Sequence, residues 1–427
     1  MKKPVRWTAV ACYGVALVLL VYAAGLFTAV LDAWPYRKAL DMATYVKLWS
    51  QIPESEKQVI GDQFNGVNHQ RVGLQVYDQQ HAWPGVTLYA SAEPNLNAYL
   101  VAMDGQVLHR WSFDLTAMFG RQPAKPVYLR RVRLLPNGDL IGLYNSVGFH
   151  ERPAGIFRAS RSGQVLWHNT MFRAHHDFDL LPDGRIVLLA QTFKQQHPTD
   201  KRLSSPYVDD EVVLLDAQGR WLETMSIVDA FLATPYERDI LLRHNAQGDY
   251  LHTNTVHAIT AEQAKHFPYG QVGDVLLTHR NRHTVSVLNL ASRKVTRLFS
   301  EFYSQIHDAR LLDNGHILVF ENRGVVLPNG RVGSLVKELD VPNRQVVWSY
   351  QGSAEKPFFT GPRGGQQRLP NGNTLIFESK SGRIFEVTPA HAIVWEYYTP
   401  VRKNGGISTV HRGDRYPIHY WQGRSTS

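Results

Sequence analysis

The most regular feature of the chain is a hydrophobic pattern that recurs around a short polar turn. Two residues, usually leucines, precede a turn that contains glycine, and further apolar residues follow it. The pattern occurs at Leu134–Ile141, Leu180–Val187, Leu311–Leu318 and Arg368–Leu375. Asn-Gly and Asp-Gly supply the positive φ angles that a tight hairpin turn needs. Each occurrence therefore predicts two strands joined by a turn.

A second pattern alternates with the first and ends in tryptophan. It occurs at Met103–Trp111, Arg161–Trp167, Val341–Trp348 and Thr388–Trp395. Two hairpins make one unit of four strands, and such units recur roughly every 45–55 residues, a period typical of propeller blades. We count six units, centred near residues 100, 145, 195, 265, 325 and 380.

The repeat predicts an all-β protein, a six-bladed β-propeller over residues 71–427. The fourth unit is the least regular. Helical spacing of apolar residues recurs within the repeats only near Ile227–Leu232 and Thr260–His266, which we expect to be short insertions.

The segment before the repeats has a different pattern. Residues 8–31 contain no charged side chain and are long enough to span a bilayer, whereas Lys2, Lys3 and Arg6 precede them. Positive residues before a span stay in the cytoplasm. The sequence predicts a cytoplasmic segment at 1–7, a transmembrane signal anchor at 8–31, and a juxtamembrane helix and linker at 32–70. The protein would be a single-pass protein of a bacterial inner membrane, with its propeller facing the periplasm.

The position of a residue within the repeat predicts which side chains face the central channel. His176 lies eight residues before the turn glycine Gly184, and His307 lies eight before Gly315. Arg130 and Gly364 occupy the same position in two other units, so the blade itself does not require histidine there. Two histidines at matched positions favour a functional role, although a single strand histidine is more often an ordinary surface or core residue.

Two strands between these units add polar side chains. His252 and Asn254 share one face of a strand, and Arg280 and Thr278 share a face of the next. We expect His307, His176, His252 and Arg280 to converge within a sphere of roughly 10 Å at one end of the channel, where sequential inner strands begin.

Composition changes this picture only slightly. The formal net charge is +9, but lysines and arginines are scattered, so no nucleic-acid-binding segment is predicted. A basic balance suits anionic small molecules or a membrane surface. Cys12 is the only cysteine, which excludes intramolecular disulfides.

These motifs resemble the bacterial arylsulfotransferase family. The resemblance covers about residues 85–415 and rests on the segments Gly85–Trp111, His175–Gly184, His252–Val256, Leu276–Asn281, Ile306–Leu312, Gly364–Glu378 and Arg412–Pro417. It implies a six-bladed propeller that moves a sulfuryl group from one phenol ester to another phenol, without a nucleotide donor and through a sulfated histidine.

The resemblance also implies roles for individual residues. His307 would be the nucleophile, and the catalytic set would be completed by His176, His252 and Arg280. Asn254 and His175 would bind substrate. The partners would be a small aromatic sulfate ester and a phenol, with no cofactor and no metal. Aromatic side chains such as Tyr144, Phe149 or Phe359 could stack on the aryl groups.

Two other functions remain open. A membrane-anchored propeller can present a binding surface without catalysis. Several converging histidines can also hold the metal of a hydrolase. Such a site usually needs inward carboxylates as well, and Asp177 and Asp308 are the obvious candidates.

Overall fold

The computed structural model describes residues 7–30, 69–93, 95–123, 126–146, 153–203, 206–241, 248–300, 306–326, 332–403 and 406–422. The chain separates into two units, Met1–Pro53 and Glu54–Ser427. The second unit holds six antiparallel sheets of four or more strands, so the predicted six-bladed propeller is confirmed.

The blades follow chain order, from the inner strand outward. Blade 1 contains β27 (Val410–Tyr416), β2 (Val86–Ser91), β3 (Ala98–Val101) and β4 (Val107–Trp111); blade 2 contains β5 (Val127–Leu134), β6 (Leu140–Ser146), β7 (Ala154–Ala159) and β8 (Val165–Asn169); blade 3 contains β9 (Ala174–Leu180), β10 (Ile186–Lys194), β11 (Tyr207–Leu215) and β12 (Trp221–Ser226). Blade 4 contains β13 (Thr253–Ala258), β14 (Val275–His279), β15 (Thr284–Asn289) and β16 (Lys294–Phe299); blade 5 contains β17 (Ile306–Leu311), β18 (Ile317–Val326), β19 (Val332–Asp340) and β20 (Gln345–Tyr350); blade 6 contains β21 (Gly365–Arg368), β22 (Thr374–Glu378), β23 (Arg383–Val387) and β24 (Ile393–Tyr398), with β1 (Gly73–Tyr77) added outside β24.

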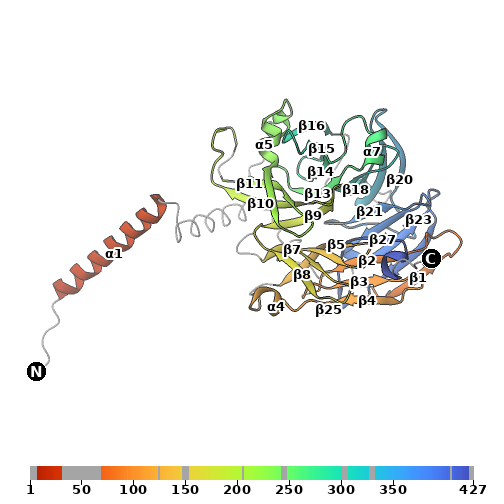
Figure 1. The fold of residues 1–427 in the computed structure, drawn as a ribbon, viewed down its shortest axis with the longest axis horizontal. Helices are drawn as coiled ribbons and strands as arrows, with labels where there is room; N and C mark the ends of the chain where they lie inside the picture. Colours follow the sequence, from red (N-terminus) through yellow and green to blue (C-terminus); the bar gives the residue numbers. More distant parts are fainter. Residues whose placement is uncertain are drawn as a thin grey trace, which may run out of the picture. The chain divides into compact units, whose positions relative to one another are not determined.

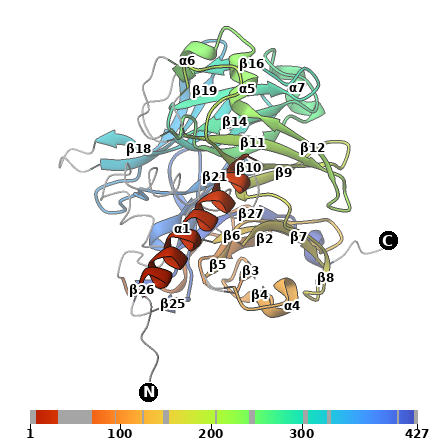
Figure 2. The same cartoon turned by 90° about the vertical axis from the view of Figure 1, so that its left-hand side faces the viewer.

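The inner strands form a closed ring. Contacts run from β5 to β9, β13, β17, β21 and β27 in turn, and β27 contacts β5. The labels of β5, β9, β13, β21 and β27 lie toward the middle of the propeller in Figure 1, and β9, β21 and β27 keep that place when the view is turned in Figure 2. Polar side chains at the start of each inner strand are therefore brought together from blades far apart in sequence.

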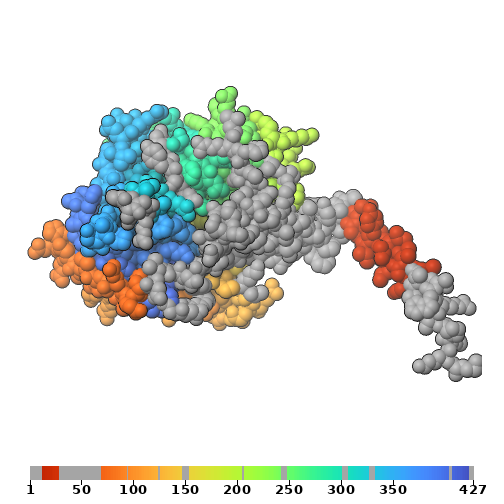
Figure 3. All heavy atoms as spheres, turned by 180° about the vertical axis from the view of Figure 1, so that it is seen from behind, coloured from red at the N-terminus to blue at the C-terminus, as the bar shows by residue number. Residues whose placement is uncertain are grey.

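Blade 1 joins the two ends of the repeat region. Its inner strand β27 comes from the C-terminal end of the chain and pairs with β2 from the N-terminal end. Figure 3 shows the result, since the orange early segment of the propeller lies beside the blue late segment. This pairing closes the ring, and repeat spacing alone did not assign β27 to the first blade.

The elements between the strands match the sequence patterns. In the β17–β18 turn, Gly315 has a φ of +83°, and its amide donates to Leu312 at 2.9 Å. Both predicted insertions are helices, α5 (Ile227–Leu232) and α7 (Ala261–His266), the latter with a capping box formed by Thr260 and Gln263. The remaining short elements are α4 (Leu115–Phe119), α6 (Glu237–Leu241), α8 (His419–Gln422), η1 (Ser379–Ser381), β25 (Arg402–Lys403) and β26 (Gly406–Ile407).

Apolar side chains fill the spaces between adjacent blades. Leu88 of blade 1 and Leu129 of blade 2 belong to one buried cluster, whereas Leu318 of blade 5 and Ile376 of blade 6 belong to another. Each of the six neighbouring pairs of blades shares such a cluster. Burial of apolar surface between blades thus holds the sheets around the ring.

The apolar N-terminal segment forms helix α1 (Trp7–Val30). Among the residues that the structure describes, however, no helix has the combined length and apolar character of a membrane span. The predicted juxtamembrane helix falls on residues 32–68, which lie outside the described residues.

The closing strand β27 generates a test of the fold. A Cβ on Gly413 would lie 1.8 Å from the carbonyl oxygen of Leu88 in β2. We expect Gly413→Ala to lower the free energy of unfolding by about 1–3 kcal/mol, the usual cost of overpacking. The measurement is chemical denaturation. Gly361→Ala is the control, because its nearest atom would be the Phe359 ring at 3.5 Å. Equal midpoints for the two variants would contradict the role of β27.

Candidate active site

The inner strands are interrupted by β-bulges. The pairing register of β5, β9, β13, β17 and β27 shifts close to Arg130, His176, Asn254, Asp308 and Arg412, respectively. His176, His252 and Asp308 also have positive φ angles, of 57°, 49° and 46°. A bulge changes the direction of the side chains beside it, so successive side chains no longer point strictly to opposite faces of the sheet here. Functional and structural side chains can thus follow one another directly in sequence.

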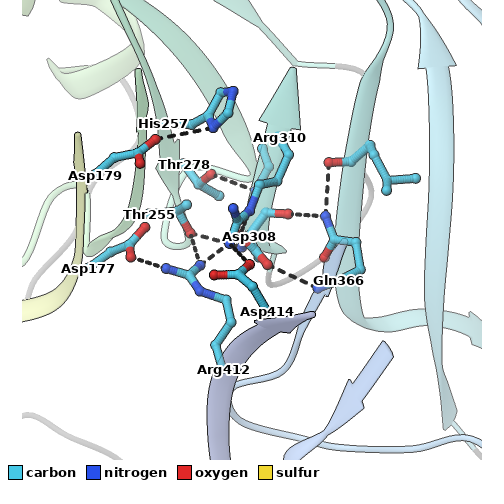
Figure 4. A network of polar contacts seen from close by, with 12 residues as sticks. Asp177, Asp179, Thr255, His257, Thr278, Asp308, Arg310, Gln366, Arg412 and Asp414 are labelled. Carbon is cyan, nitrogen blue, oxygen red and sulfur yellow. Dashed lines mark hydrogen bonds and ion pairs between the residues drawn. The ribbon is translucent and has the colours of Figure 1, made fainter. Parts of the chain in front are cut away.

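A network of ion pairs lies inside the ring, as shown in Figure 4. Arg412 of β27 binds Asp177 of β9, and its Nη1 lies 2.7 Å from Oδ1 of Asp308 in β17. Arg131 of β5 lies 2.6 Å from Asp414 and 3.4 Å from Asp177. These charges are buried and compensate one another across the propeller axis.

The two aspartates that follow the predicted histidines also bind backbone amides of neighbouring blades. Asp177 accepts from the amide of Val256 at 3.1 Å, and Asp308 accepts from that of Gln366 at 3.0 Å. Burial alone would raise the pKa of Asp308, but Arg310 and Arg412 hold it below its usual value. The carboxylates of Asp177 and Asp308 therefore connect neighbouring blades.

The hypothesis of a metal-dependent hydrolase relied on these two carboxylates. Among the described residues, no group of three His, Cys, Asp or Glu could hold a metal ion.

His176 is held by the histidine before it in the chain. Nε2 of His175 lies 2.9 Å from the carbonyl oxygen of Ala190, so this nitrogen carries a proton. Nδ1 of a neutral His175 then accepts from Nδ1–H of His176, at 2.6 Å. Burial, followed by His175 and His252, lowers the pKa of His176 well below its usual value. His176 is therefore neutral at pH 7 and keeps a lone pair on Nε2.

His252 is oriented by an aspartate that the sequence patterns did not reveal. Its Nδ1 lies 2.7 Å from Oδ2 of Asp249, whose Oδ1 accepts from the His252 amide at 3.1 Å. Although burial would raise the pKa of Asp249, His252 and Arg280 lower it. The amide of Arg280 donates to the His252 carbonyl at 3.2 Å. An ionised Asp249 keeps a proton on Nδ1 of His252 and leaves Nε2 as the nitrogen that can exchange a proton with a ligand.

The predicted histidines lie near one another. The rings of His176 and His252 have centroids 5.2 Å apart, and both His307 and Arg130 act electrostatically on His176. We call His176, His252 and His307 the histidine cluster. Arg280 acts electrostatically on Asp249, which in turn binds His252 of this cluster. Side chains from blades 3, 4 and 5 thus meet near the end of the ring where the inner strands begin.

Two predicted substrate-binding residues have other contacts. His175 is 3% exposed, and its two ring nitrogens contact Ala190 and His176. It therefore positions the His176 ring. Asn254 donates from Nδ2 to the carbonyl of Ile306 at 3.1 Å and ties β13 to β17. The sequence predicted that His252 and Asn254 share one face of a strand. His252 instead precedes β13 and Asn254 lies at the bulge of this strand, so the alternation of faces does not relate the two residues.

The aromatic candidates are dispersed. Tyr144 is fully buried, and its hydroxyl lies 2.5 Å from Nε2 of His168, so it belongs to the core of blade 2. Phe359 is 43% exposed. Phe149 lies outside the described residues.

Comparison with known proteins gives one family. A family model described as "Arylsulfotransferase (ASST)" matches residues 131–400. No curated protein matches the chain. Among solved structures, a protein of unknown function from Bacteroides caccae is 13% identical and has a TM-score of 0.48, covering 77% of this chain and 98% of its own. Apo AztD from Citrobacter koseri is 9% identical with a TM-score of 0.38, covering 79% and 100%. A streptogramin B lyase is 8% identical with a TM-score of 0.40, covering 83% and 97%.

The buried network predicts a strong effect for one carboxylate. Asp308→Asn removes a charge that faces Arg412 and Arg310 while keeping the size of the side chain. We expect a loss of about 3 kcal/mol in the free energy of unfolding, because buried charges lose compensation. Denaturant titration measures it. Asp313→Asn, in the exposed turn of the same blade, should change stability by less than about 0.5 kcal/mol. Equal effects of the two variants would show that the network contributes nothing.

Proposed function

This chain belongs to the arylsulfotransferase family, and we propose that it transfers a sulfuryl group from a phenolic sulfate ester to a phenol through a sulfohistidine. The observation that supports this most is the pair of differently prepared histidines. His176 is kept neutral, whereas His252 is oriented by an ionised Asp249. One site thereby holds an uncharged imidazole and a second imidazole positioned to give and take a proton, near Arg280, whose charge suits an anionic group.

The first half of the reaction breaks the ester of the donor. A ring nitrogen of His307 attacks the sulfur, an N–S bond forms, and the S–O bond to the aryl oxygen breaks. The leaving phenolate takes a proton from protonated Nε2 of His252. Arg280 stabilises the negative sulfuryl oxygens, whose charge persists throughout the transfer.

The second half returns the enzyme to its starting state. The acceptor phenol gives its proton to Nε2 of His252, and its oxygen attacks the sulfur. The N–S bond breaks, and the electron pair returns to His307. Asp249 stabilises the imidazolium that forms on His252. The net change is exchange of the sulfuryl group between two phenols, with no oxidant, reductant or nucleotide consumed.

The nucleophile can be tested by activity and by mass. We expect the purified protein to release nitrophenol from p-nitrophenyl sulfate when phenol is present. His307→Asn should lower kcat/KM at least 1,000-fold, since covalent catalysis is lost. His81→Asn, at a surface histidine, is the matched control.

The same experiment separates the alternatives. The protein is mixed with donor alone, and its peptides are then mapped by mass under alkaline conditions. We expect a sulfuryl group on the peptide that contains His307. A label on the His176 peptide would keep the reaction class and move the nucleophile. No nitrophenol release by the unmodified protein would contradict the transferase and favour a non-catalytic binding propeller.

Location in a bacterial inner membrane, with the propeller in the periplasm, is also part of the proposal. It rests on the uncharged run at 8–31 after Lys2, Lys3 and Arg6, and on the exposure of apolar side chains along α1, such as Leu20 at 68%.

Membrane retention tests that location. We expect the full chain to stay in the membrane pellet after alkaline washing. Leu20→Arg should shift much of it to the supernatant, because an arginine at the centre of a membrane-spanning helix costs about 3 kcal/mol. Leu20→Val is the control. Recovery of the unmodified chain in the soluble fraction would contradict the anchor.

A further inference from the structure

We infer that a second anion-binding subsite adjoins the histidine cluster and selects aromatic substrates that carry an acidic group besides the transferred sulfuryl. The subsite consists of Arg130, Arg363 and His411, which we call the basic subsite. This inference rests on the proposed function, because it assigns the non-reacting end of the substrate to residues beside the reaction centre.

The three residues come from three blades that are consecutive around the ring. His411 lies on β27, Arg130 lies at the bulge of β5, and Arg363 immediately precedes Gly364 and β21. Inner strand β27 contacts both β5 and β21. Arg130 acts electrostatically on Arg363, on His411 and on His176. Arg130 therefore connects the basic subsite with the histidine cluster, contributed by the other three blades.

The local structure fixes the side chain of Arg130 and the backbone at Arg363. Nε of Arg130 donates to Oδ1 of Asn145 at 2.5 Å, and this bond orients the guanidinium plane. The carbonyl of Arg363 accepts from Asn322, which is fully buried, and Arg363 has a φ of +65°. A residue held in this sparsely populated conformation is often part of a functional site.

His411 points to a ligand more directly. It is 3% exposed, and its Nε2 is buried without a hydrogen-bond partner. A buried polar atom in that state costs free energy unless a ligand or water satisfies it. Burial, followed by Arg363 and Arg130, lowers the pKa of His411 well below its usual value, so the imidazole is neutral at pH 7. A neutral imidazole can still donate Nε2–H to an anion.

The charges of the basic subsite specify the sign of that ligand. Burial lowers the pKa of Arg130 to about 10, and burial together with Arg130 lowers that of Arg363. Arginine side chains stay cationic at pH 7, and Arg130 lowers the pKa of Arg363 because the two like charges repel each other. An anionic group between them relieves that repulsion and is bound by charge-assisted hydrogen bonds. A carboxylate or sulfonate on the aromatic ring, opposite the sulfuryl group, has this chemistry.

Binding of non-reacting dianions tests the subsite separately from turnover. A sulfonate mimics the sulfuryl group but has no ester bond to break. We expect 3- or 4-sulfobenzoate to bind the full-length protein at least tenfold more tightly than benzenesulfonate in calorimetry. In Arg363→Gln the preference should fall below threefold, and His411→Asn is a second variant with the same expectation. Arg185→Gln, at an exposed turn of blade 3, should leave both binding and basal transfer unchanged.

Acceptor selectivity provides the second readout. Transfer to 4-hydroxybenzoate relative to 4-hydroxybenzamide should fall at least tenfold in Arg363→Gln compared with the unmodified protein, and the ratio removes differences in phenol reactivity. Equal binding of sulfobenzoate and benzenesulfonate by the unmodified protein would overturn the subsite, whatever the transfer assay gives. Preferential sulfobenzoate binding without transfer to any phenol would support the subsite and contradict the proposed reaction.

Discussion

The contacts of Arg412 with Asp177 and Asp308 connect β27, β9 and β17 across the propeller axis. Charges at this depth are stable only when they are matched, so these strands must keep their relative positions. Close approach is built into the backbone, because a Cβ on Gly365 would lie 2.5 Å from the Arg412 side chain. The polar network thus complements the apolar clusters between the blades, and it lies immediately beside the residues that begin each inner strand.

Residues that are adjacent in the inner strands therefore have different roles in the site. His176 and Asp177 are adjacent in the chain, yet one belongs to the histidine cluster and the other binds Arg412. His307 and Asp308 divide in the same way. The bulges make this possible, since consecutive side chains can then serve different layers of the same inner strand. A rigid buried layer beneath the histidines is what a preorganised electrostatic site requires.

The protonation states within the site follow from its surroundings. Burial and nearby cations hold His176 and His411 neutral, whereas Asp249 stays ionised beside His252 and Arg280. In the proposed transfer His252 must give up a proton and later regain it, and the ionised Asp249 stabilises its protonated form. An imidazole positioned in this way is compatible with the arylsulfotransferase family, to which the chain belongs.

The sequence by itself determined the blade number and several of the turns, because local hydrophobic spacing and glycine chemistry repeat in most of the units. It also selected His176 and His307, since equivalent positions in a repeat face the same axis. Only the tertiary structure decided that β27 closes blade 1, that Asp249 orients His252, and that His411 and Arg363 lie near Arg130. The first and third join residues that are distant in sequence, and the second lies before β13, where strand periodicity carries no information.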